Sequence, residues 1–208
     1  MILATSQVAN TVANLKSRYY KYLEALCTAN GVDIGTLKTN GSEYEELEMF
    51  FGGLPVLIGL KYFERLKILR LFGQDIVNLK PLVEVSETLE ELWICEGPLK
   101  DLTGIDACRK LTKVFLYDCH IEDGSLLGKL PGIDSLWIQN NNLKDFSFLD
   151  NLQQLTILQI GGKQFNDHTA LTVQTWPHKL QELDCNANSV ISLQVLLFST
   201  NFITNNIY

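Results

Sequence analysis

Cysteine and histidine side chains are the first candidates for chemistry in this chain. Cys95, Cys119 and His120 fall on neighbouring stretches, and thiolate and imidazole groups are ligands that zinc prefers. However, no C-x-x-C pair accompanies them, and Cys119 occupies a position that the pattern described below turns inward. We therefore expect no metal site and no cofactor.

Catalytic motifs are missing as well. The chain contains no G-x-S-x-G, no H-E-x-x-H, no Walker lysine loop and no G-x-G-x-x-G motif. His168 and His178 lie close together in the sequence, but no nucleophile accompanies them. We predict that the protein is not an enzyme.

A hydrophobic motif, L-x-x-L-x-L, recurs along most of the chain. Its clear copies begin 23, 22, 22, 22 and 25 residues apart, at Leu66, Leu89, Leu111, Ile133, Leu155 and Leu180. Extending the register backwards adds one unit that begins at Tyr44. Such a period is typical of leucine-rich repeats, in which each unit contributes one short strand and a return segment.

The repeat predicts an α/β leucine-rich repeat solenoid over residues 44–208, with about seven repeats. We expect a curved parallel β-sheet on the concave face. The convex returns are too short for full α-helices, so 3₁₀ turns and irregular segments are expected there.

Residues 1–43 differ from the repeats and predict an N-terminal helical cap. Apolar residues there follow helical spacing, at Val8, Val12, Leu15, Tyr19, Leu23 and Leu26. The first strand of a solenoid exposes an edge and an open core, which a helix can cover. A helix that binds a partner is the alternative.

The outward positions of the strands carry the candidate binding residues. When the leucines point inward, the third, fifth and seventh residues of each unit point outward on the concave sheet. This places Trp93, Phe115 and Trp137 side by side, flanked by Phe72 and Tyr117, and we expect all five to face solvent. The predicted partner-binding set comprises Phe72, Trp93, Phe115, Tyr117, Trp137, Arg70, Glu91, Lys113 and Gln139.

Exposed aromatic patches usually mark interaction sites, and aromatic side chains anchor protein interfaces. The alternative is that the aromatic residues only stiffen the sheet by covering one another. An acidic rim surrounds the predicted patch and would suit a partially basic partner. It consists of Glu90, Glu91, Glu96, Asp118 and Asp134.

Charge and cysteine usage limit the partners and the compartment. A net charge of −7 argues against direct binding of nucleic acid, which needs a basic face. No stretch is apolar enough for a membrane span, and the N-terminus does not resemble a secretory signal. The five cysteines are scattered, which favours an intracellular, cytoplasmic setting.

The C-terminal end continues the repeat. Phe202 follows Leu180 by 22 residues, and Ile207 then falls at a strand position. We expect either that the chain is the N-terminal piece of a longer protein or that it self-associates through this end.

The repeat consensus resembles the 22-residue type of the family of regulatory subunit seven of protein phosphatase one. Residues 20–165 also resemble the N-terminal repeats of the leucine-rich repeat-containing protein nine family. The matching segments are Leu47–Phe51, Gln74–Ile76, Leu89–Ile94, Gly104–Cys108 and Leu116–Asp118.

This resemblance implies a non-enzymatic adaptor that binds another protein, with a link to cilia. The alternatives are a regulatory subunit of a protein phosphatase and a self-associating component of a ciliary or cytoskeletal assembly.

Overall fold

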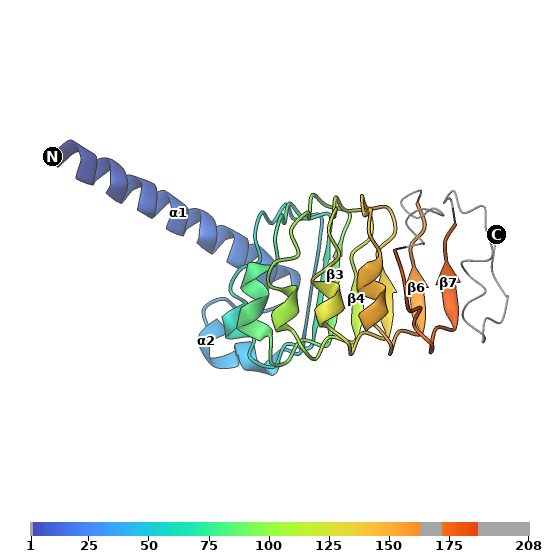
Figure 1. Cartoon of the computed structure of the whole chain (residues 1–208). Helices are drawn as coiled ribbons and strands as arrows, with labels where there is room; N and C mark the ends of the chain where they lie inside the picture. Colours follow the sequence, from blue (N-terminus) through green and yellow to red (C-terminus); the bar gives the residue numbers. More distant parts are fainter. Residues whose placement is uncertain (1, 163–171, 187–208) are drawn as a thin grey trace.

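The computed structural model describes residues 2–162 and 172–186. Seven parallel strands form one sheet in the order of the chain (Figure 1). They are β1 (Glu46–Phe50), β2 (Ile68–Phe72), β3 (Glu91–Cys95), β4 (Lys113–Phe115), β5 (Ser135–Trp137), β6 (Ile157–Gln159) and β7 (Glu182–Asp184). Each begins at the third position of its predicted unit.

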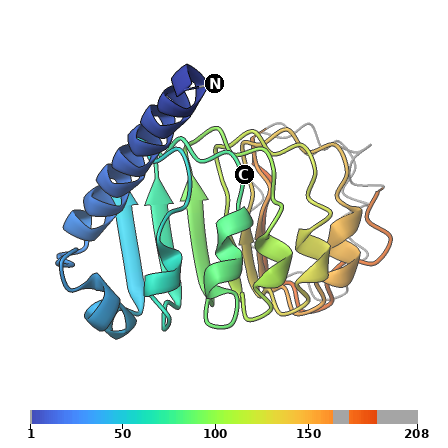
Figure 2. The same cartoon turned by 90° about the vertical axis from the view of Figure 1, so that its left-hand side faces the viewer.

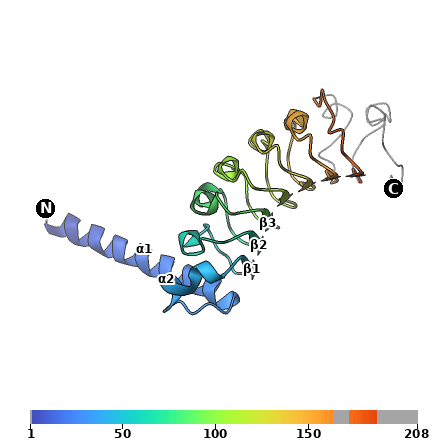
Figure 3. The ribbon, with the colours of Figure 1, turned by 90° about the horizontal axis from the view of Figure 1, so that it is seen from below.

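The return segments contain short 3₁₀ helices on the convex side, as expected. They are η2 (Leu60–Tyr62), η3 (Lys80–Val85), η4 (Ile105–Ala107), η5 (Leu127–Lys129) and η6 (Ser147–Asn151). Figure 3 shows the strands on the inner side of an arc and these helices on its outer side. The predicted leucine-rich repeat solenoid is therefore confirmed.

The repeated leucines build one continuous core between the two layers. In β1 buried and exposed residues alternate, with Leu47 and Met49 inside. In the next repeat Leu66, Leu69 and Leu71 are buried in the same way. Each buried leucine contributes roughly 1.5–3 kcal/mol relative to an exposed one, so the stacked repeats stabilise one another.

Polar side chains close the turn after three of the strands. Asn141 Nδ2 donates to the carbonyls of Leu116 and Ile138, and Asn141 Oδ1 accepts from the N–H of Ile121. Gln74 makes equivalent bonds three repeats earlier, and the Cys119 thiol, one repeat before Asn141, donates to Ile94 O. The turn position that usually holds asparagine therefore keeps its function with three different residue types.

The N-terminal segment forms α1 (Ile2–Ala29), α2 (Leu37–Asn40) and the 3₁₀ helix η1 (Gly41–Glu43). The last turns of α1 contact the repeats, where Leu23 and Leu26 are buried. Figure 2 shows this end of the helix beside β1. Leu23 packs against the bare backbone of Gly59, where a Cβ would lie 2.4 Å from the leucine Cδ1.

Most of α1 projects away from the solenoid (Figure 1). Every residue from 13 to 21 is exposed, including Leu15 and Tyr19 of the predicted apolar stripe. The end of the predicted stripe covers the first repeat, because the helix is longer than the edge that it covers. The boundary between a cap at residues 1–43 and the repeats stays a prediction.

None of the helices in the described part of the chain combines the length and apolar character needed to cross a bilayer. His168, Phe202 and Ile207, on which the predictions for the last loop and the C-terminal end depend, lie outside the described residues.

Candidate protein-binding surface

The register of the sheet places the predicted aromatic residues next to one another. Trp93 on β3 pairs with Phe115 on β4, and Phe115 pairs with Trp137 on β5. Ring centroids are 3.7 Å apart for Trp93 and Phe115 and 5.1 Å apart for Phe115 and Trp137. Phe72 continues the row, with its ring 5.8 Å from that of Trp93.

Phe115 corrects one expectation, because it does not face solvent. Its exposed fraction is 6%, although its backbone places it on the concave face. The two tryptophan rings on either side approach to 5.9 Å and cover it. Phe115 therefore supports Trp93 and Trp137, which are themselves half-buried.

Phe50 extends the row, and the exposed Phe51 follows it in the chain; the predicted set omitted both. Phe50 stacks on Phe72 with centroids 5.0 Å apart and planes 7° apart, and it is 55% exposed. Phe51 is 73% exposed. Phe50 shares the seventh column with Phe72, so the repeat register already contained the signal for it. We call Phe50, Phe51, Phe72, Trp93, Phe115 and Trp137 the aromatic row.

A chain of ion pairs lies beside the aromatic row. Arg70 bridges Glu46, at 3.0 Å, and Glu91, at 3.1 Å. Glu91 also lies 3.7 Å from Lys113 and accepts a hydrogen bond of 2.7 Å from Trp93 Nε1. Glu91 therefore joins the predicted charged residues to the aromatic row and fixes the orientation of the Trp93 ring.

The acidic rim is smaller than predicted, because Glu91 is neutralised by Arg70 and Lys113. Glu90, Glu96 and Asp118 are exposed. Among residues 2–162 and 172–186, no salt bridge includes these three. They give the surface around the aromatic row an acidic character.

Tyr117 and Gln139 complete the predicted set at the carboxyl ends of their strands. Burial, followed by the nearby Cys95 and Glu96, raises the pKa of Tyr117 to about 12, so its hydroxyl stays protonated and can donate a hydrogen bond. Gln139 Nε2 donates to Gln159 Oε1 at 3.4 Å. Tyr117 and Gln139 are half-buried.

The cysteines near this surface have structural roles. Cys95 donates to Phe115 O at 3.3 Å, and burial raises the pKa of its thiol. Burial likewise raises the pKa of Cys119 to about 11. Protonated thiols that donate to backbone carbonyls are poor nucleophiles and poor metal ligands. In the part of the chain that the structure describes, no group of three metal-binding side chains is found.

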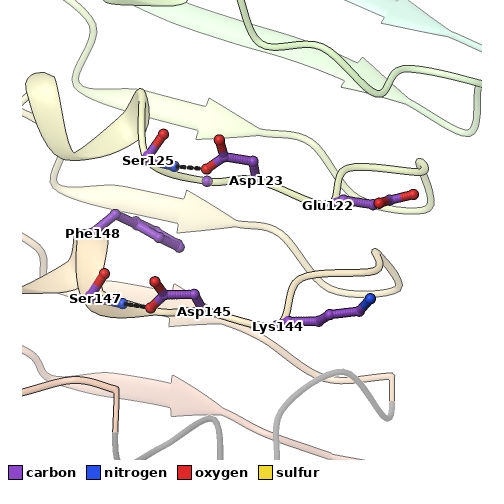
Figure 4. A pocket seen from close by; sticks show the side chains of 8 residues that line it. Glu122, Asp123, Ser125, Lys144, Asp145, Ser147 and Phe148 are labelled. Atoms are coloured by element: carbon purple, nitrogen blue, oxygen red, sulfur yellow. Dashed lines mark hydrogen bonds between the residues drawn. The ribbon is translucent and has the colours of Figure 1, made fainter.

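A shallow pocket of about 270 Å³ lies in the return segments (Figure 4). It is lined by Glu122, Asp123, Gly124, Ser125, Lys144, Asp145, Ser147 and Phe148. Asp123 accepts a hydrogen bond from the backbone N–H of Ser125, and Asp145 accepts one from that of Ser147. Each carboxylate thus holds the turn that leads into a 3₁₀ helix.

Three solved bacterial structures have the same architecture. An internalin C2 of Listeria monocytogenes is 19% identical, with a TM-score of 0.60, and the match covers 86% of this chain and 88% of that one. The internalin InlF of the same species is 16% identical, with a TM-score of 0.54, and the match covers 79% of this chain and 61% of that one. A leucine-rich repeat protein of Leptospira interrogans is 17% identical, with a TM-score of 0.54, and the match covers 70% of this chain and 44% of that one.

This chain thus spans about three fifths of the InlF structure. No protein-family profile matches the chain, and the resemblance to the phosphatase-subunit and protein-nine families stays a prediction. The three structural likenesses concern architecture. They show that the chain has the leucine-rich repeat fold.

Proposed function

We propose that the chain is a non-enzymatic interaction module that binds another protein through the aromatic row on its concave face. The observation that carries this proposal is the continuous contact of aromatic rings from Phe50 to Trp137 across five strands. Exposed aromatic groups that already hold one another in place lose little entropy when a partner binds.

The charges beside the aromatic row support a polar rim around an apolar centre. Arg70, Glu91 and Lys113 satisfy one another, so a partner need not supply charges to pair with them. Glu90, Glu96 and Asp118 are left for a partner, which favours a surface with basic residues around an apolar or aromatic anchor.

Affinity purification with mass spectrometry tests this proposal. The bait is the full chain, and it is compared with the Trp93→Ala/Trp137→Ala variant. Val83→Ala serves as the control, because Val83 is an exposed apolar residue on the convex helix η3. We expect a set of proteins that the wild type and the Val83 variant retain and the tryptophan variant loses.

Identical sets from all three baits would contradict the proposal, provided that circular dichroism shows the same fold for each bait. The proteins recovered also test the two predicted alternatives. A phosphatase catalytic subunit would indicate a regulatory role, and recovery of the bait sequence itself would indicate self-association. These alternatives and the intracellular, cytoplasmic location stay predictions.

A further inference from the structure

The projecting part of α1 is an apolar helix face that the solenoid does not cover. Leu15 is 59% exposed and Tyr19 is 44% exposed, and a shallow pocket between them also involves Lys16 and Tyr20. Farther along the same stripe, Leu26 is buried and Tyr22 packs against the core of the repeats. The apolar side of the helix is therefore packed on the repeats at its C-terminal end and exposed at Leu15 and Tyr19.

The spacing of this stripe is that of a coiled-coil seam. Val8, Val12, Leu15, Tyr19, Tyr22 and Leu26 follow one another at intervals of 4, 3, 4, 3 and 4 residues. An alternating 3-4 spacing keeps one narrow seam facing a partner helix over several turns. Since α1 is 28 residues long and its last turns pack on the repeats, it offers about three heptads to such a partner.

The charges next to the seam specify the partner. In this heptad register Lys16 and Arg18 occupy the two positions that flank the seam, where interhelical ion pairs form. Glu24 is the one acidic residue in the sequence of α1, and it falls on the side opposite the seam. A second copy of α1 thus offers no acidic group to Lys16 and Arg18.

The narrow seam also distinguishes a helix from a membrane surface as the partner. A helix that lies in a membrane interface has a wide apolar face, whereas a stripe limited to the two seam positions suits a coiled coil. Lys16 and Arg18 flank the seam directly, and Asn14 and Ser17 lie farther round the helix; all four are exposed.

We propose that the projecting part of α1 docks an acidic amphipathic helix of a partner protein along the seam of Leu15 and Tyr19, as a two-stranded coiled coil. Lys16 and Arg18 pair with acidic residues that flank the seam of that helix. This docking site is separate from the aromatic row and does not depend on the proposed function.

The test uses the full chain and a synthetic peptide of about 28 residues, with leucine at the seam positions and glutamate at the flanking ones. Mutual repulsion of the glutamates disfavours pairing of the peptide with itself. Fluorescence anisotropy of the labelled peptide is expected to show saturable binding. A peptide with lysine in place of glutamate is expected to bind at least about tenfold more weakly.

Matched variants locate the binding site. Leu15→Ala/Tyr19→Ala is expected to weaken binding by at least about tenfold, whereas Val83→Ala leaves it unchanged, because Val83 is 61% exposed but lies on the convex helix η3. Lys16→Glu/Arg18→Glu is expected to reverse the preference between the two peptides, and Lys21→Glu is the charge control. These residues are exposed, so all variants should fold.

Three outcomes would overturn the proposal. One is absence of binding, or equal binding of both peptides. Another is a concentration-dependent dimer in sedimentation that Leu15→Ala/Tyr19→Ala abolishes, which would make a second copy the occupant. The third is cosedimentation with phosphatidylserine vesicles that the same variant abolishes. The Trp93→Ala/Trp137→Ala variant is expected to bind the peptide as the wild type does. This control separates the test of the α1 site from that of the aromatic row.

Discussion

The side-chain amide of Asn30 pairs with the backbone of Glu48 at the edge of the sheet as a neighbouring strand would. Asn30 Oδ1 accepts from the N–H of Glu48 at 2.8 Å, and Asn30 Nδ2 donates to the Glu48 carbonyl at 2.9 Å. Nδ2 also donates to Leu26 O at the end of α1. One residue therefore satisfies the edge of β1 and joins it to the helix, which blocks addition of a further strand there.

Replacement of Asn30 by alanine should lower the free energy of unfolding by about 1–3 kcal/mol, because three hydrogen bonds are lost at once. Urea denaturation followed by circular dichroism measures this change. Asn40→Ala is the control, because its side chain makes no cap hydrogen bond at the start of η1. An equal loss for both variants would show that the Asn30 amide has no special role at this edge.

The eighth residue of each of the first six repeat units turns the chain with a left-handed backbone. This position has a positive φ in six successive repeats, at Phe51, Gly73, Glu96, Asp118, Asn140 and Gly162. Phenylalanine rarely adopts such a conformation, and Phe51 does so at φ 51° while being 73% exposed. Strain of this kind is often retained where a side chain has a function, which supports a role for Phe51 in binding.

Phe51→Gly should raise the free energy of unfolding by about 0.5 kcal/mol, because relief of backbone strain outweighs the added flexibility of the unfolded chain. Gly73→Ala should lower it by more than about 1 kcal/mol, because alanine is strained at the positive φ of Gly73 and its methyl group would also lie 2.3 Å from Phe51 Cδ1. A double-mutant cycle measures the coupling. If the Gly73→Ala penalty is the same without Phe51, the explanation by ring contact is wrong.

The repeat period alone predicted the seven strands and their register, because each inward leucine specifies which side chains point outward. Glu48, Arg70, Trp93 and Phe115 pair across the sheet in the order predicted from their column. The burial of Phe115 could not be predicted this way, since a column gives the direction of a side chain and not the rotamers of its neighbours.

The projection of α1 also escaped prediction. An apolar stripe shows that a helix has a binding side, but it does not show how much of the stripe its own domain covers. The left-handed turns escaped for a different reason. Glycine, aspartate and asparagine tolerate such backbones and occur at Gly73, Asp118, Asn140 and Gly162, whereas Phe51 and Glu96 have side chains that usually avoid them.

Cys119 offers a test of the polar side chains that close the turns, because it occupies the position that Asn141 occupies one repeat later. Cys119→Asn should raise the free energy of unfolding by about 1 kcal/mol, since an amide makes stronger hydrogen bonds than a thiol. Asn141→Ala should lower it by about 1–3 kcal/mol, because the Leu116 and Ile138 carbonyls lose their donor. Urea denaturation at neutral pH measures both. A loss of stability in Cys119→Asn would mean that the site is too small for an amide.

The same variant should change the pH dependence of stability. Burial raises the pKa of Cys119 from 9.0 to about 11, so the folded chain holds this proton more tightly than the unfolded chain. The resulting stability is complete below pH 9 and is lost as the pH rises through 11. Cys119→Asn should therefore make the decline over this range less steep. A part of the decline should persist, because Cys108 and Tyr117 also have raised pKa values.

Stability and binding should separate within the aromatic row. Phe115→Ala should lower the free energy of unfolding by about 3 kcal/mol, because a ring that is 94% covered leaves a cavity between Trp93 and Trp137. Phe50→Ala should lower it by less than about 1 kcal/mol, because more than half of that ring is already in water. Denaturation in urea gives both values.

Phe50→Ala should weaken partner binding strongly, although it has little effect on stability. Once affinity purification has identified a partner, titration calorimetry should show a loss of affinity of about tenfold or more for Phe50→Ala, which removes exposed apolar surface from the row. Val83→Ala, on the convex side, should bind as the wild type does. Normal binding by Phe50→Ala, together with loss of binding by Trp93→Ala/Trp137→Ala, would show that Phe50 makes no contribution. The contact surface would then be limited to the part of the row around the tryptophans.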